Sequence, residues 1–226
     1  MVTRGVVFDL DDTLYLERDY VRSGFAHVAR RLATSAAESR DVAAWLCRAF
    51  DDGLRGDTFD RLIAARPKLA DQVTSAELVD AYRGHAPSIS FMPGIAELLQ
   101  RLRAQGLKLG VLSDGPLVSQ RAKAEALGLA EWFDPVLLTA SRGEGFAKPG
   151  TGGFEWIAAM WKLPPAELAY VADNPLKDFV GPRKLGWHTI RLRIPRQLRF
   201  ALESVDDFYR PDVEVAGPAA LVDYLT

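Results

Sequence analysis

The sequence predicts an α/β fold, in which a mainly parallel β-sheet has helices on both faces and a helical insertion follows the first strand. Two observations favour this fold. Short apolar, β-branched runs recur along the 226 residues, and most precede a stretch with helical periodicity. From about residue 19 to residue 84 the pattern is helical throughout. Because parallel sheets bind ligands beyond the carboxyl ends of their strands, the chemistry should lie just after each strand.

Five apolar runs are the candidate strands of this sheet. They cover Val6–Phe8, Leu109–Leu112, Val136–Thr139, Leu168–Ala172 and Thr189–Leu192. Between them, apolar residues recur at helical spacing, for example at positions 95, 98, 99 and 102 and again at 154, 157, 158 and 161. We therefore expect these helices to cover the sheet.

The region between the first two strands predicts a separate helical unit. Its apolar stripes indicate four short helices, which could pack as a bundle. Pro93–Gly94 marks the return to the main domain. The expected division is a core formed by residues 1–16 and 88–226, with a helical insertion over residues 17–87.

Composition argues against several classes of protein. The chain has 28 basic and 30 acidic residues, so it lacks the basic excess typical of nucleic-acid binders. The single cysteine, Cys47, allows no intramolecular disulfide, which fits a reducing cytoplasm. The N-terminus has no leader pattern, and no apolar run approaches the ~20 residues that span a bilayer. We expect a cytoplasmic monomer or homodimer with no nucleic-acid or membrane partner.

Four polar clusters follow the predicted strands or the loops between them. In chain order they are Asp9, Asp11, Asp12 and Thr13; Ser113 and Asp114; Lys148, after the loop 141–147; and Asp173, Asn174 and Asp178. If the sheet is parallel, all four clusters point to the same edge. A lone acid pair or a Ser-Asp-Gly turn is a weak signal, but this ordered combination favours a functional site.

These residue types suit the hydrolysis of a phosphate monoester. Asp9 can attack phosphorus to form an aspartyl-phosphate, and Asp11 can protonate the leaving oxygen and then deprotonate water. Carboxylate and phosphate repel each other by about 4 kcal/mol per unit-charge pair at ~4 Å and an effective dielectric of ~20, so a cation is required. Oxygen ligands at Asp9 and Asp173 suit Mg²⁺. The Ser113 hydroxyl and the Lys148 ammonium can hold phosphoryl oxygens.

With these clusters, the chain resembles members of the haloacid dehalogenase superfamily, in its phosphatase branch. The resemblance is carried by FDLDDTL at residues 8–14, VLSDG at 111–115, KPG at 148–150 and VADNPLKDF at 171–179. It implies a Rossmann-like core in which Asp9 is the nucleophile and Asp11 the general acid/base. It also implies Mg²⁺ held by Asp9, by the backbone carbonyl of Asp11 and by Asp173.

The resemblance also implies roles for the remaining clusters. The implied phosphate-binding residues are Ser113, Asp114 and Lys148, and the supporting residues are Thr13, Asn174 and Asp178. Asp114 stands where many relatives have asparagine, and Ala172 where the family commonly has glycine. The insertion is similar to a C1-type cap, which closes over the substrate and excludes water. Asp12 is expected to serve the turn.

Several alternatives to a phosphatase follow from the same residues. Dehalogenases of this family lack the second aspartate, so Asp11 argues against that reaction, whereas a phosphomutase keeps both aspartates and stays open. A phosphoaspartate receiver is disfavoured because Asp173 and Asp178 follow Lys148. A non-catalytic phosphate-binding protein is disfavoured because every reactive position is filled.

The expected function is Mg²⁺-dependent hydrolysis of a small phosphorylated metabolite, such as a sugar phosphate or a nucleotide. The insertion and its hinges should select the leaving group. The candidate residues that face the substrate are Tyr15, Arg18, Tyr20 and Arg22.

Overall fold

The computed structural model describes residues 2–225 and divides the chain into two compact units. One unit comprises the residues up to Arg18 together with those from Ser90 onward. The other comprises Asp19–Ile89. The first unit contains the sheet and the second is helical, so each is described separately.

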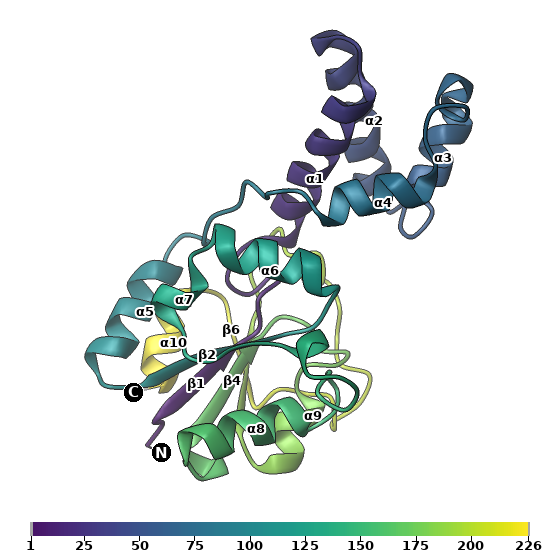
Figure 1. The fold of residues 1–226 in the computed structure, drawn as a ribbon. Helices are drawn as coiled ribbons and strands as arrows, with labels where there is room; N and C mark the ends of the chain where they lie inside the picture. Colours follow the sequence, from purple (N-terminus) through teal and green to yellow (C-terminus); the bar gives the residue numbers. More distant parts are fainter. Residues whose placement is uncertain (1, 226) are drawn as a thin grey trace. The chain divides into compact units, whose positions relative to one another are not determined.

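The first unit is built on a six-stranded parallel sheet (Figure 1). The strands are β1 (Gly5–Phe8), β2 (Lys108–Ser113), β3 (Val136–Leu138), β4 (Leu168–Ala172), β5 (His188–Leu192) and β6 (Val213–Val215). Their order is β3-β2-β1-β4-β5-β6. Every residue of the central strands β1 and β4 is buried, as expected for strands covered on both faces. The predicted parallel α/β fold is confirmed.

The apolar pattern of the sequence did not predict one strand, β6, which lies at the edge of the sheet beside β5. Its three residues read Val-Glu-Val, and Glu214 is exposed. A run this short carries too little apolar alternation to be separated from a loop.

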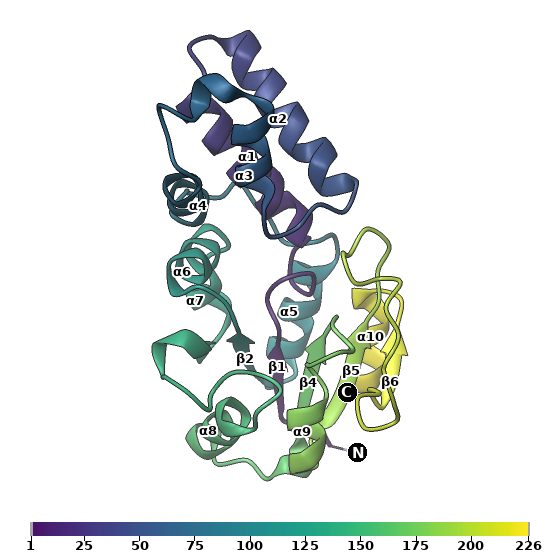
Figure 2. The ribbon, with the colours of Figure 1, turned by 90° about the vertical axis from the view of Figure 1, so that its right-hand side faces the viewer.

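Helices form a layer on each side of the sheet (Figure 2). On one side lie α8 (Gly152–Trp161) and α9 (Val180–Leu185). On the other side α5 (Ile95–Ala104) packs against α10 (Pro218–Leu225). The connections after β2 and β3 contain α6 (Leu117–Ala126), α7 (Leu129–Trp132) and the 3-10 turn η2 (Thr139–Ser141), and η3 (Pro165–Glu167) precedes β4.

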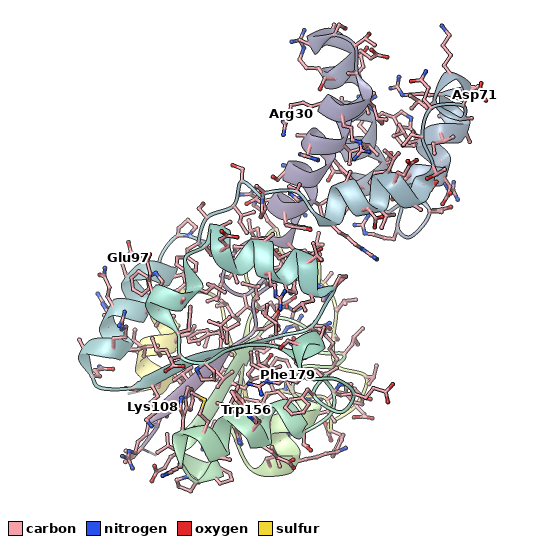
Figure 3. The ribbon with its side chains drawn as sticks, viewed as in Figure 1. Arg30, Asp71, Glu97, Lys108, Trp156 and Phe179 are labelled. Atoms are coloured by element: carbon pink, nitrogen blue, oxygen red, sulfur yellow. The ribbon has the colours of Figure 1, made fainter. Side chains whose placement is uncertain are left out.

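The core lies where these layers meet the sheet. On the α8–α9 side, Phe154 packs edge-on against Tyr170 and Trp187, with ring centroids 4.9 and 5.4 Å apart. Phe179, labelled in Figure 3, is fully buried in the same cluster. On the other side, α5 buries its predicted stripe of Ile95, Leu98, Leu99 and Leu102. This packing fixes the strand ends that carry the polar residues.

The second unit consists of four helices and one 3-10 turn. They are α1 (Glu17–Leu32), which begins in the first unit, α2 (Ala36–Asp51), α3 (Thr58–Ala65), η1 (Pro67–Leu69) and α4 (Ser75–Arg83). Phe25 of α1 lies at the centre of an aromatic cluster with Phe50, Phe59 and Tyr82. The predicted helices are present, and their action as a cap stays a prediction.

Within the described residues, no helix combines the length and the apolar character needed to cross a membrane.

Candidate active site

Three neighbouring strands of the sheet end in the predicted polar residues. Asp9 follows β1, and its backbone N–H donates to Val171 of β4 at 2.9 Å. Ser113 is the last residue of β2, and Asp173 follows the end of β4. Because β2, β1 and β4 are adjacent and parallel, these side chains meet at one edge of the sheet, where all three are buried.

Lys148 reaches this edge from the loop before α8. Its ammonium lies 2.6 Å from Asp9 Oδ1 and 2.8 Å from Asp178 Oδ1, and it donates to the Tyr170 hydroxyl at 2.9 Å. The lysine side chain is fully buried. Burial lowers the pKa of Lys148, but the charges of Asp178 and Asp9 outweigh it, so the pKa lies well above its ordinary value. The lysine is therefore a fixed positive charge beside Asp9.

Asp9, Asp173 and Asp178 form a buried cluster of carboxylates, with one oxygen of each within 4.8 Å of the others. Burial raises the pKa of Asp9 to about 6, against the opposing charge of Lys148. Burial, reinforced by the charges of Asp178 and Asp9, also places the pKa of Asp173 well above its ordinary value. One lysine does not balance three buried acids, so the cluster lacks positive charge.

The cluster fits a magnesium ion. Asp173 Oδ2 is buried, and no described residue donates a hydrogen bond to it. The Arg199 guanidinium is 3.9 Å away, beyond hydrogen-bonding distance. An oxygen-only donor set with an unsatisfied carboxylate oxygen is the environment that Mg²⁺ prefers.

The turn after β4 holds this cluster in place. The Asn174 backbone N–H donates to Asp178 Oδ2 at 3.0 Å, and the Asn174 side-chain oxygen accepts from Leu176 N at 3.0 Å. These two hydrogen bonds close the turn that carries Asp173 and Asp178, and Asp178 in turn contacts Lys148. Ala172, the residue before Asp173, is fully buried within β4.

Asp11 lies at the same edge, but its carboxylate has a different set of partners. Oδ1 accepts from the Tyr15 hydroxyl and from the Lys123 ammonium, the latter at 2.7 Å. Oδ2 accepts from the Gln120 amide at 3.0 Å. Burial raises the pKa of Asp11, but the charge of Lys123 and the three donors outweigh it, so the pKa lies below its ordinary value. These contacts therefore favour the ionised form of Asp11.

Ser113 and Asp114 are hydrogen-bonded to α6 and to the segments that follow β3 and β4. The Gln120 amide lies 2.6 Å from Ser113 Oγ and 3.0 Å from the Asp114 carbonyl oxygen. The Asp114 carboxylate accepts from Thr139 at 2.8 Å, from the Lys148 backbone N–H at 3.3 Å and from the Lys177 ammonium at 3.2 Å. The Asp114 side chain thus positions the segment that carries Lys148.

The turn after Asp11 is fixed by a segment near the C-terminus. Asp12 is fully buried in the left-handed backbone region, with φ of 55°. Its carboxylate accepts from Glu17 N at 2.8 Å and from Leu198 N at 2.6 Å, and its carbonyl accepts from the Gln197 amide at 2.6 Å. The following residue, Thr13, is also fully buried. The expected role of Asp12 in the turn therefore extends to anchoring residues 197 and 198.

A cavity of about 190 Å³ opens beside these groups. Asp9, Asp11, Asp173 and Asp178 line it together with Lys123, Lys177 and Arg199. Of the proposed substrate-facing residues, Tyr15 is buried against Asp11, and Arg18 donates to the Arg196 carbonyl at 2.7 Å. Tyr20 packs edge-on against Tyr82 in the helical unit, and Arg22 lies 3.6 Å from Asp51.

Sequence reasoning missed Gln120, Lys123 and Arg199. Gln120 and Lys123 are three residues apart on α6, a spacing that places them on the same helix face, but many surface helices share that spacing. Arg199 lies beyond the last predicted strand, where no pattern in the sequence relates it to Asp173. The tertiary structure is what brings these residues to the site.

Comparisons with known proteins bear on both fold and family. The model of the family described as haloacid dehalogenase-like hydrolase matches residues 3–186. The chain is 27% identical to a glyceraldehyde 3-phosphate phosphatase of Methanocaldococcus jannaschii, over 97% of this chain and 96% of the relative. It is also 27% identical to a ribulose-1,5-bisphosphate 5-phosphatase of Halopiger xanaduensis, over 89% of each.

A solved structure extends the likeness to three dimensions. It is a haloacid dehalogenase-like hydrolase of Bacillus subtilis bound to magnesium, and it aligns over 100% of both chains with a TM-score of 0.68. The sequence identity is 18%, so this likeness shows a shared fold. The predicted enzyme class, a phosphatase, agrees with the curated relatives. The family model matches most of the length of the chain, and the structure has the strand-end acids and the buried lysine. The chain therefore belongs to the haloacid dehalogenase-like hydrolases.

Proposed function

We propose that the protein is a Mg²⁺-dependent phosphatase that hydrolyses a small sugar phosphate or related metabolite through an aspartyl-phosphate on Asp9. The observation that carries this proposal is the position of Asp9. Its carboxylate contacts the buried Lys148 at 2.6 Å, belongs to the cluster with Asp173 and Asp178, and lines the cavity. A nucleophile, a fixed cation and metal ligands therefore meet at one point.

In the first step a carboxylate oxygen of Asp9 attacks phosphorus, and the bond from phosphorus to the leaving oxygen breaks. Asp11, once protonated, gives its proton to that oxygen, so the product leaves as an alcohol. Lys148 stabilises the negative charge on the phosphoryl oxygens and on Asp9. The Ser113 hydroxyl, at the end of β2, donates to a phosphoryl oxygen.

In the second step Asp11 accepts a proton from water, and the water oxygen attacks phosphorus. The bond between phosphorus and Asp9 breaks, which releases inorganic phosphate, restores the Asp9 carboxylate and leaves Asp11 protonated for the next turnover. Asp9, the carbonyl of Asp11 and Asp173 are the proposed ligands of Mg²⁺, with Asp178 beside them. When bound, the ion supplies positive charge that allows a phosphate dianion to approach these acids.

The substrate class is supported by the relatives whose names specify phosphorylated sugars. A phosphomutase is the second candidate, because it would use the same two aspartates. For either function, we propose that residues 17–87 form a cap that selects the substrate. We also propose that the protein lies in the cytoplasm.

The test is phosphate release across a panel of sugar phosphates, including glyceraldehyde 3-phosphate, and nucleotides. We expect release that needs Mg²⁺, stops with EDTA and returns when Mg²⁺ is restored. Asp9→Asn should abolish it, since an amide is a poor nucleophile towards phosphorus. Asp71→Asn, at an exposed aspartate of the helical unit labelled in Figure 3, is the matched control.

An Asp9→Asn variant with full activity, or release that ignores EDTA, would contradict the mechanism. Transfer of phosphate between two positions of a sugar without net release would identify a mutase. Halide release from a 2-haloacid in place of phosphate release would indicate a dehalogenase.

A further inference from the structure

Two buried polar side chains of α6 meet the proposed acid/base, although the reaction steps above give them no part. Gln120 and Lys123 lie almost one turn apart on one face of α6, and both are buried. Burying a lysine costs several kcal/mol of lost hydration, which a close and well-oriented partner must offset. The residue that Lys123 meets is Asp11, at 2.7 Å.

The contacts constrain the Asp11 carboxylate at both of its oxygens. Lys123 and Tyr15 donate to Oδ1, and Gln120 donates to Oδ2 at 3.0 Å. A carboxylate bound at both oxygens, from α6 and from the segment after β1, cannot rotate without breaking one of these bonds. Gln120 also contacts Ser113 Oγ at 2.6 Å, which couples the position of Asp11 to that of the proposed phosphate-binding hydroxyl.

This constraint matters because Asp11 has strong competing attractions nearby. It lies two residues from Asp9, whose carboxylate contacts the fully buried Lys148 and belongs to the proposed Mg²⁺ site. A free carboxylate would be drawn to either cation, and it could then no longer exchange a proton with the leaving oxygen. In the structure the Asp11 carboxylate stays outside the cluster of Asp9, Asp173 and Asp178.

We propose that Lys123, assisted by Gln120, is a positioning residue that holds the Asp11 carboxylate apart from the acid cluster and available to the leaving group. This inference rests on the proposed phosphatase function. It assigns α6 a part in proton transfer, in addition to its packing beside the sheet.

The test compares two substrates whose leaving groups differ in their need for a proton. The substituted phenol of p-nitrophenyl phosphate leaves readily as an anion, whereas the alcohol of glycerol 3-phosphate must be protonated. Lys123→Met keeps most of the length of the side chain but removes its charge. We expect kcat for glycerol phosphate to fall by about tenfold or more, and kcat for the aryl phosphate to fall much less, with little change in KM for either substrate.

Two further variants separate positioning from damage to the fold. Lys123→Arg restores a cation at the same site, so it should recover most of the activity with glycerol phosphate. Arg121→Met removes a cation from the exposed face of the same helix and should leave both substrates unaffected. Equal losses with both substrates, or no loss with either, would overturn the proposal.

A crystal structure of Lys123→Met tests the positioning independently of activity. The expected result is an Asp11 carboxylate turned towards Lys148 or the acid cluster. An unmoved Asp11 would contradict the inference, even if the wild-type enzyme is a phosphatase. Absence of phosphate release from every substrate by the wild-type protein would instead count against the proposed function. The crystal structure of Lys123→Met would still test whether Lys123 positions Asp11.

Discussion

At the scale of single residues, the site is governed by the balance of buried charge. Lys148 contacts both Asp9 and Asp178, and all three side chains are buried or nearly so. Such an arrangement adds little net stability, because desolvation offsets most of the attraction. Its value lies in holding Asp9 ionised and oriented beside the cavity.

Removing the lysine should therefore destabilise the protein as well as inactivate it. We expect Lys148→Met to lower the free energy of unfolding by about 3–5 kcal/mol, because two carboxylates remain buried without their cation. Urea denaturation in the presence of EDTA measures this change. Adding Asp178→Asn to the variant should recover part of the loss. An unchanged unfolding midpoint for Lys148→Met would show that water already compensates these charges.

At the scale of elements, the site depends on how closely two segments approach. Helix α9 begins beside the loop that carries Lys148, and Gly181 lies at the contact. A Cβ at Gly181 would be 2.6 Å from the Gly150 carbonyl oxygen and 3.1 Å from that of Pro149. Only glycine allows this approach without moving the backbone just after Lys148.

Substituting this glycine should affect stability and activity together. We expect Gly181→Ala to lower the free energy of unfolding by about 1–3 kcal/mol, because the added methyl group overpacks against backbone. The displaced loop should also lower kcat. Gly217→Ala is the matched control, because a Cβ there meets nothing within 4 Å. Thermal unfolding and phosphate-release assays of both variants check the prediction, and equal behaviour of the two would refute it.

At the scale of the whole molecule, the packing of the sheet offsets the electrostatic repulsion within the acid cluster. The central strands β1 and β4 bring Asp9 and Asp173 side by side, and sheet packing holds them there although they repel each other. A bound cation removes that repulsion in the folded state. An unfolded chain scatters the acids and loses the site, so metal binding should be coupled to stability.

This coupling gives a measurable outcome. With free Mg²⁺ at about 100 times its dissociation constant, we expect about 2.7 kcal/mol of added stability, seen as a higher unfolding temperature than in EDTA. Asp173→Asn should lose most of this increase, while Asp71→Asn should keep it. A shift of equal size in the Asp173→Asn variant would place the stabilising ion elsewhere.

Much of the architecture could be predicted from the sequence, for a physical reason. β1 and β4 are buried on both faces, so they read as continuous apolar runs that end abruptly in acids. The stripe of α5 has one buried face and therefore a helical period. Edge strand β6 is too short and too exposed to leave such a pattern.

The sequence by itself determined which chemistry is present, because Asp9, Asp11, Lys148 and Asp173 each follow a strand or loop that a parallel sheet brings to one edge. Only the tertiary structure decided their partners. The pairing of Lys123 with Asp11 spans 112 residues, and that of Leu198 with Asp12 spans 186. Contacts over such separations depend on how helices and loops pack in three dimensions, which local periodicity does not encode.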